Sequence, residues 1–200
     1  MTIYDQKPLD TSGLQTVPLA ERPAKVGVGE FGRPYQKGSG VGALVDSLPR
    51  ILAGDSFRSV VQAILTAREK QKPIIWGLGG HVVKVGLGPV LIDLMERGFI
   101  TALAMNGATS IHDFEVALAG STSEDVDVTL PGGKFGMAEE TGAWMNQAIS
   151  AASERGIGMG EALGEFLQAK LSNSGSESVR FPQASILLQA YRRKIPNLRR

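Results

Sequence analysis

The sequence contains no cysteine and only two histidines among its 200 residues. The absence of cysteine excludes disulfide bonds, thiolate zinc sites and a cysteine nucleophile. No apolar run approaches the ~20 residues that span a bilayer, and the opening segment MTIYDQKP lacks the apolar core of a signal peptide. These absences predict a soluble, cytoplasmic protein with no membrane association.

Neither sign of charge is in excess, because 21 Lys and Arg residues stand against 20 Asp and Glu residues, a net charge of +1. That balance gives no electrostatic case for a nucleic acid or an acidic membrane as partner. The last ten residues nevertheless hold five basic side chains, namely Arg192, Arg193, Lys194, Arg199 and Arg200. A basic end this short is usually a solvated tail, and we interpret it so.

Hydrophobic residues make up 42% of the chain, which is enough for a packed core in one domain. Residues 1–41 are instead rich in proline and glycine, and they predict an extended amino-terminal arm that is mobile without a partner surface. Residues 42–200 are expected to form one α/β domain, with a helical segment over 121–178.

Two strand-like runs, 74–76 and 100–105, each end in small residues and precede one of the histidines. The first run is followed by GLGGH and the second by NGATSIHD. Residues 82–97 between the runs have helical spacing, with the regular part expected from Gly88. Ligands of open parallel sheets bind at the carboxyl ends of the strands, so this edge is the predicted site.

Apolar spacing also predicts the other elements of the chain. Helices are expected over 42–50, 55–70, 112–118, 138–152, 159–171 and 181–193. The polar stretch 123–133 is expected to be a loop, and 172–178 a linker. Residues 197–200 do not resemble an apolar strand.

The glycine-containing turn after the first strand can bind a phosphate. Gly79 and Gly80 let backbone amides approach an anion, and the following helix adds a favourable dipole. A tight turn without a ligand explains the same residues equally well. His81 can orient a ribose or substrate group or bond the loop backbone. Lys84 can meet a phosphate or lie on the helix surface.

The second turn, Asn106-Gly107-Ala108, is followed by an adjacent imidazole and carboxylate. His112 and Asp113 are candidate catalytic residues, although Asp113 also suits plain capping of a helix start. Zinc ligation by His81, His112 and Asp113 is chemically conceivable, but no pair has helical i, i+4 ligand spacing, and no metal is predicted. The G-x-S-x-G motif of an α/β-hydrolase is absent.

Four motifs together resemble the deoxyhypusine synthase family, in particular its bacterial deoxyhypusine-synthase-like members. They are GGH at 79–81, GLGP at 86–89, DLMERG at 93–98 and NGATSIHD at 106–113. The resemblance covers residues 42–120 and, more loosely, 180–196. It implies a Rossmann-like parallel sheet with flanking helices, NAD as cofactor, and a homotetramer that transfers an aminobutyl group from a polyamine to an amine acceptor.

By position, the resemblance implies cofactor contacts at the two turns, with His112 and Asp113 near cofactor or substrate. The cofactor-binding residues would be Gly79, Gly80, His81, Lys84, Asn106, Gly107 and Ala108. The chain departs from the family at the first turn, where Gly80, His81 and Lys84 replace the usual hydroxyl residues.

The family also continues past the position of Pro196 into another strand and a region that carries the imine-forming lysine. The resemblance therefore implies that the sheet is incomplete on its carboxyl-terminal side, and it assigns no catalytic lysine here. A non-catalytic nucleotide-binding or assembly subunit on the same scaffold is the alternative.

Overall fold

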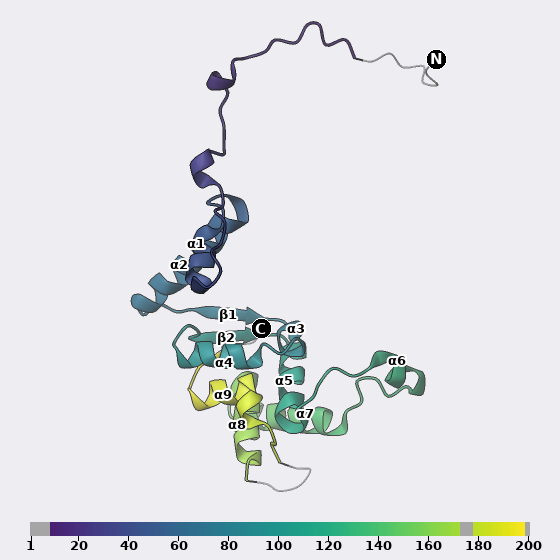
Figure 1. Ribbon diagram of the computed structural model, residues 1–200. Coiled ribbons are helices and arrows are strands. Elements are labelled where there is room, and N and C mark those ends of the chain that lie inside the picture. The colour runs from purple at the N-terminus through teal and green to yellow at the C-terminus, as the bar shows by residue number, and fades with distance from the viewer. Residues whose placement is uncertain (1–8, 173–177, 199–200) are drawn as a thin grey trace, which may run out of the picture. The chain divides into compact units, whose positions relative to one another are not determined.

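The computed structural model describes residues 9–172 and 178–198 (Figure 1). The chain divides into two compact units, one up to Val61 and one from Gln62 onwards. This boundary lies inside the long helix α2 (Leu52–Glu69). Helix α2 begins three residues before the expected start at Asp55.

The amino-terminal unit has no interior of its own. Before α2 it contains short 3-10 turns at Leu19–Glu21 and Val28–Glu30 and the helix α1 (Gly40–Ser47). None of its described residues is buried, and apolar side chains such as Leu14 and Phe31 are more than half exposed. Its stability therefore owes little to burial of apolar surface.

A single arginine ties the two helices of this unit together. The Arg58 guanidinium, on α2, donates hydrogen bonds to the backbone carbonyls of Val45, Leu48, Pro49 and Gly54. Val45, Leu48 and Pro49 lie at the end of α1 and in the turn that follows it, and Gly54 lies in the first turn of α2. Arg58 thus joins the end of α1 to the start of α2 and gives the Leu48 and Pro49 carbonyls a hydrogen-bond donor.

The second unit contains a parallel three-stranded sheet in the order β1–β2–β3. Strand β1 (Ile75–Leu78) pairs with β2 (Ala102–Met105), and β2 pairs with β3 (Asn197–Leu198). The protein is therefore of mixed α/β class, mostly helical around a small parallel sheet. The expectation that 197–200 forms no strand is wrong for 197–198, because backbone pairing with β2 needs no apolar run of its own.

Two helices, and not one, connect β1 to β2. They are α3 (Gly80–Lys84) and α4 (Gly88–Glu96). The chain turns between them at Gly86, whose φ of 80° favours glycine, and Pro89 then occupies the first turn of α4. The expected start of the regular helix at Gly88 is confirmed, and residues 80–84 form a separate short helix.

After β2 the chain is helical almost throughout. The elements are α5 (Gly107–Ala119), α6 (Val126–Thr129), α7 (Glu139–Glu154), α8 (Met159–Lys170), a 3-10 turn at Pro182–Ala184 and α9 (Ile186–Arg192). Helix α6 corrects the expectation of a loop, because the Asp125 side chain accepts hydrogen bonds from the first-turn N–H groups. The predicted last helix is divided at Ser185, which caps α9.

The core of this unit lies between the sheet and the helices that follow it. Leu103 of β2, Phe114 of α5, Leu163 and Leu167 of α8 and Ile186 of α9 are all completely buried. Helices α8 and α9 lie side by side (Figure 1), and a Cβ atom on Gly164 would overlap with the Cβ atom of Tyr191. The glycine therefore sets how closely these helices approach.

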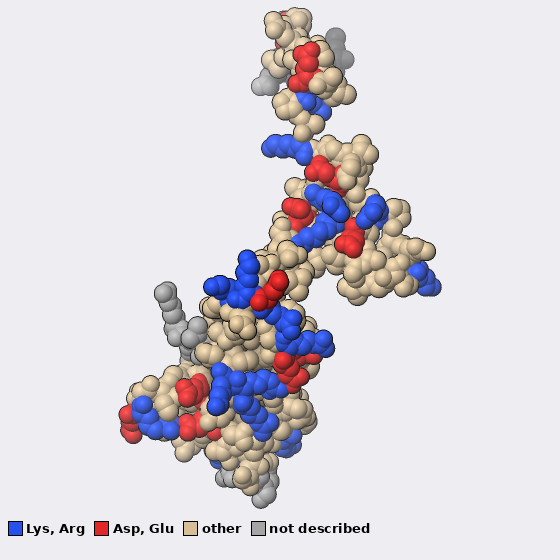
Figure 2. Space-filling model, turned by 90° about the vertical axis from the view of Figure 1, so that its left-hand side faces the viewer, with Lys and Arg blue, Asp and Glu red and all other residues tan. Residues whose placement is uncertain are grey.

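The surface carries both signs of charge. Figure 2 shows Lys and Arg side chains next to Asp and Glu side chains on the face drawn. Exposed ion pairs join Asp93 to Arg97 and Arg155 to Glu165, and such pairs contribute little to stability. Within the described ranges, no helix combines the length and the apolar character that crossing a membrane requires.

Candidate functional site

Parallel pairing of β1 with β2 places the two glycine-containing turns next to each other. Leu78 and Met105 are paired at the carboxyl ends of the strands, and the turns follow directly. A Cβ atom on Gly80 would lie 3.1 Å from the Cβ of Ala108 and 3.1 Å from Cδ2 of His112. Helices α3 and α5 can approach this closely because residue 80 is glycine.

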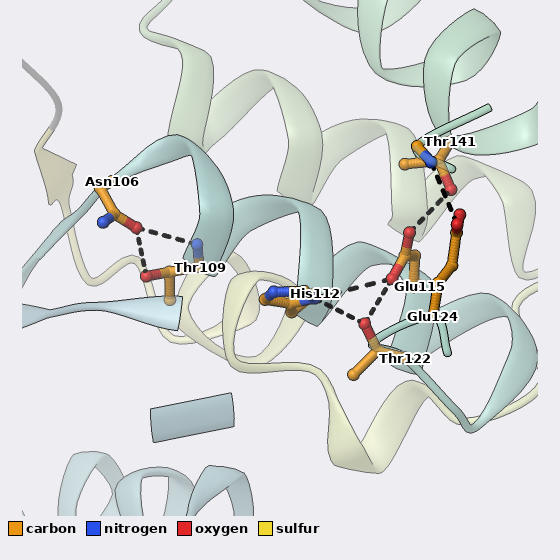
Figure 3. Close-up of polar contacts among 8 residues, drawn as sticks. Asn106, Thr109, His112, Glu115, Thr122, Glu124 and Thr141 are labelled. Carbon is orange, nitrogen blue, oxygen red and sulfur yellow. Dashed lines mark hydrogen bonds and ion pairs between the residues drawn. The ribbon is translucent and has the colours of Figure 1, made fainter. Parts of the chain in front are cut away.

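A buried threonine joins the second turn to the end of β1. The Asn106 side-chain oxygen accepts a hydrogen bond from the Thr109 N–H at 2.9 Å and lies 2.7 Å from the Thr109 hydroxyl (Figure 3). The same hydroxyl is 3.1 Å from the Leu78 carbonyl oxygen. Asn106 is the N-cap of α5, which therefore begins at Gly107 and not at the expected His112.

The turn residues leave room for a ligand. Gly79, His81, Lys84, Asn106 and Ala108 are exposed, while Gly80 and Gly107 are half-buried. A Cβ atom on Gly79 would meet nothing within 4 Å. The backbone N–H groups of Gly107 and Ala108 find no acceptor among the described residues. A negatively charged group is favoured at such a helix start.

Asp113 is buried, and both of its carboxylate oxygens are engaged. The Ile186 N–H donates to Oδ1 at 2.6 Å, and the Leu187 N–H (2.9 Å) and Ser185 hydroxyl (2.7 Å) donate to Oδ2. Asp113 therefore caps the start of α9. The expectation that it caps the start of its own helix is wrong, because α5 begins at Gly107 and places residue 113 in its middle.

Burial raises the pKa of the Asp113 carboxyl from its ordinary 3.8 to about 6, against the lowering effect of the three hydrogen bonds. With no exposed surface, its side chain cannot contact a ligand at the open edge. Of the two candidate catalytic residues, His112 alone is placed to do so.

This raised pKa predicts that stability depends on pH. The folded chain holds the Asp113 proton more tightly than the unfolded chain, so the stabilisation is present at acidic pH and lost as pH rises through the folded pKa. We expect this group to lower the free energy of unfolding by up to about 3 kcal/mol between about pH 4 and about pH 7.

Urea unfolding of the wild type and of Asp113→Asn, at both pH values, measures this contribution because the variant lacks the titrating group. The advantage of the wild type over the variant should shrink towards neutral pH. An advantage that stays constant or grows would show that burial does not control this carboxyl.

His112 lies between the turns and a neighbouring cleft. Its Nδ1 is 2.7 Å from the Thr122 hydroxyl and 3.8 Å from Oε2 of Glu115 (Figure 3). The Cδ2 edge of the ring faces Gly80, and 19% of the side chain is exposed. His112 thus contacts the first turn with one edge and a polar cluster with the other.

The cleft is formed by α5, residues 121–124 and the start of α7. One cavity of about 600 Å³ is lined by Glu115, Thr122, Glu124 and Thr141, among others. A second cavity, of about 330 Å³, shares Glu115, Glu124 and Thr141 and extends to Gly107 at the second turn. The cleft therefore runs from the polar cluster to the predicted turn.

Sequence reasoning missed Glu115, Thr122 and Thr141. Glu115 could have been found, because it follows His112 by three residues and shares a helix face with it. The two threonines reach the site through the fold, and Thr141 Oγ1 lies 3.5 Å from Oε1 of Glu115. Nothing local marks either threonine.

The conceivable zinc ligands do not converge. Asp113 is directed at the start of α9, whereas His81 is exposed on α3. Among the described residues, no three His, Asp or Glu side chains are grouped so as to hold a metal ion.

No family model matches the chain, and no curated protein matches it. The resemblance to the deoxyhypusine synthase family therefore depends on the motifs between residues 79 and 113.

Proposed function

We propose that this chain is a deoxyhypusine-synthase-like protein that binds NAD at the carboxyl edge of β1 and β2, on a Rossmann-like sheet. The observation that carries the proposal is the close approach of the two turns, where Gly80 meets Ala108 and His112. Ligands of open parallel sheets bind outside the carboxyl ends of the strands, which is where these two turns lie. The motifs of the family resemblance fall on these same turns.

The residues present fit the cofactor. Gly79 offers open space where a side chain would intrude, and the N–H groups of Gly107 and Ala108 can meet the pyrophosphate. Lys84 and His81 are exposed on the helix that follows the first turn. When bound, NAD supplies a hydride acceptor; the chain supplies the backbone contacts and the position of His112.

The reaction that we propose is transfer of an aminobutyl group from a polyamine to an amine acceptor. The cleft next to His112 supports an amine ligand, because three carboxylates line it, those of Glu115, Glu124 and Glu140. The single arginine in its lining, Arg180, donates hydrogen bonds to the backbone carbonyls of Leu118 and Ala119. A cleft rich in one sign of charge attracts ligands of the other sign. A homotetramer in the cytoplasm belongs to the same proposal.

A non-catalytic nucleotide-binding or assembly subunit is the second candidate. Asp113 favours it, because one of the two candidate catalytic side chains is committed to holding α9. Incubation with spermidine and NAD separates the two, since oxidation of the amine produces NADH absorbance. Binding of NAD without NADH formation would favour the second candidate.

The NAD site predicts a loss of affinity in Gly79→Val. Residue 79 has extended backbone and open space around its Cβ position, so valine is tolerated by the fold but occupies the space of the cofactor. We expect NAD affinity, measured by calorimetry, to fall at least about tenfold, or about 1.4 kcal/mol.

Gly158→Val is the matched control. Gly158 also caps a helix, α8, with extended backbone and open space, and it lines a cavity formed by α8 and α9 instead of the turns. The Gly158→Val variant should leave NAD affinity unchanged. Equal affinity of both variants and the wild type would place the cofactor elsewhere.

A further inference from the structure

A continuous series of hydrogen bonds joins three side chains and ends beside the first turn. The Thr122 hydroxyl lies 2.7 Å from Nδ1 of His112 and donates a hydrogen bond to Oε2 of Glu115 (Figure 3). His112 and Glu115 come from α5, whereas Thr122 lies in the segment that follows it. About four-fifths of both ionisable side chains is shielded from solvent.

The hydrogens available to these three side chains determine which nitrogen of the imidazole is protonated. A threonine hydroxyl has one proton, and a carboxylate has none to give. The Thr122 proton therefore lies in the bond to Glu115, and the Thr122 oxygen can only accept from His112. Consequently, Nδ1 of His112 must carry a hydrogen.

We propose that Thr122 and Glu115 hold neutral His112 as the Nδ1–H tautomer, so that Nε2 presents a lone pair to the ligand at the first turn. The hydrogen bond made by one ring nitrogen sets the protonation of the other. Thr122 and Glu115 are positioning residues, because they act on the ligand only through His112.

The free ring nitrogen is accessible. No described residue forms a hydrogen bond with Nε2. Among the described residues, every buried side-chain nitrogen or oxygen has a hydrogen-bond partner, so Nε2, which has none, must reach solvent. Its ring neighbour, Cδ2, is the atom that faces Gly80. The lone pair of Nε2 thus emerges at the turn, where it accepts a hydrogen bond from an N–H or O–H group of a ligand, or a proton.

Glu115 also suits the protonated state. If Nε2 takes a proton from a ligand, the His112 ring becomes positively charged. Its nearest nitrogen to Glu115 is Nδ1, which lies 3.8 Å from Oε2 of that carboxylate. A carboxylate at this distance can form an ion pair with the protonated ring. The inference deepens the proposed function by naming the side chain that receives a ligand's hydrogen, and its test needs no NAD, so either proposal can fail alone.

Nitrogen NMR of the full chain with labelled histidine tests the tautomer directly. The spectra are recorded at alkaline pH, where imidazoles are neutral, and His81→Gln assigns the remaining signal to His112. We expect His112 to show a protonated Nδ1 and an unprotonated Nε2. Exposed His81 is the internal reference and should favour the Nε2–H form of free histidine.

Two variants test the cause of the tautomer. Thr122→Val combined with Glu115→Leu removes both acceptors, and His112 should then revert to mainly Nε2–H, while Thr122→Ser should retain Nδ1–H. Unchanged His81 signals show that the fold around the turn is intact. A wild-type His112 in the Nε2–H form, or an Nδ1–H form that survives the double change, would overturn the proposal.

Discussion

Asp113→Ala is expected to lower the free energy of unfolding by about 4 kcal/mol at about pH 4, where the contribution of Asp113 is largest, because truncation leaves three buried donors without an acceptor. These donors are the Ser185 hydroxyl and the N–H groups of Ile186 and Leu187, all enclosed in the core. Since α9 leads directly into β3, the loss should loosen the third strand as well as the helix. Urea unfolding followed by circular dichroism measures it.

Asp93→Ala is the matched control. Asp93 also accepts from a helical neighbour, Arg97, but both side chains are half-exposed or more. Exposed pairs of this kind contribute about 0.5 kcal/mol or less. Equal losses for the two alanine variants would mean that Asp113 does not hold the start of α9.

Gly164→Ala is expected to destabilise the chain by about 3 kcal/mol, although alanine is the better helix former. A Cβ atom at residue 164 would overlap with the Tyr191 Cβ and lie 3.2 Å from the Leu187 carbonyl oxygen. Both contacts belong to α9, so relief requires α8 and α9 to separate. Thermal or urea unfolding gives the change in stability.

The same substitution in the neighbouring helix should have the opposite sign. A Cβ atom on Gly142, in α7, would meet nothing within 4 Å, so Gly142→Ala should stabilise by about 0.5 kcal/mol through helix propensity. If Gly164→Ala also stabilises, α8 and α9 do not pack as closely as described.

Local patterns predicted the edge of the sheet where the two turns lie. The apolar runs ending at Trp76 and Met105 became β1 and β2, and parallel pairing then placed their small-residue turns together. Both features depend on residues that are near one another in sequence. For this reason the position of the two turns at one edge of the sheet could be predicted from spacing.

Long-range contacts explain what the sequence did not reveal. The donors to Asp113 follow it by 72 to 74 residues, so a sequence window around residue 113 suggests only a local cap. Strand β3 forms because β2 offers it a partner, and Thr141 reaches Glu115 across 26 residues. Such partners are decided by packing of the whole unit and leave no local pattern.

A crystal structure of the full chain with saturating NAD tests the central claim most directly. We predict that the dinucleotide lies against Gly79 and Gly80, with its pyrophosphate at the N–H groups of Gly107 and Ala108 and the His112 ring beside it. NAD bound elsewhere would contradict the claim, for example in the cavity of about 860 Å³ lined by residues of α8 and α9. A crystal in which saturating NAD leaves the edge of β1 and β2 empty would contradict it equally.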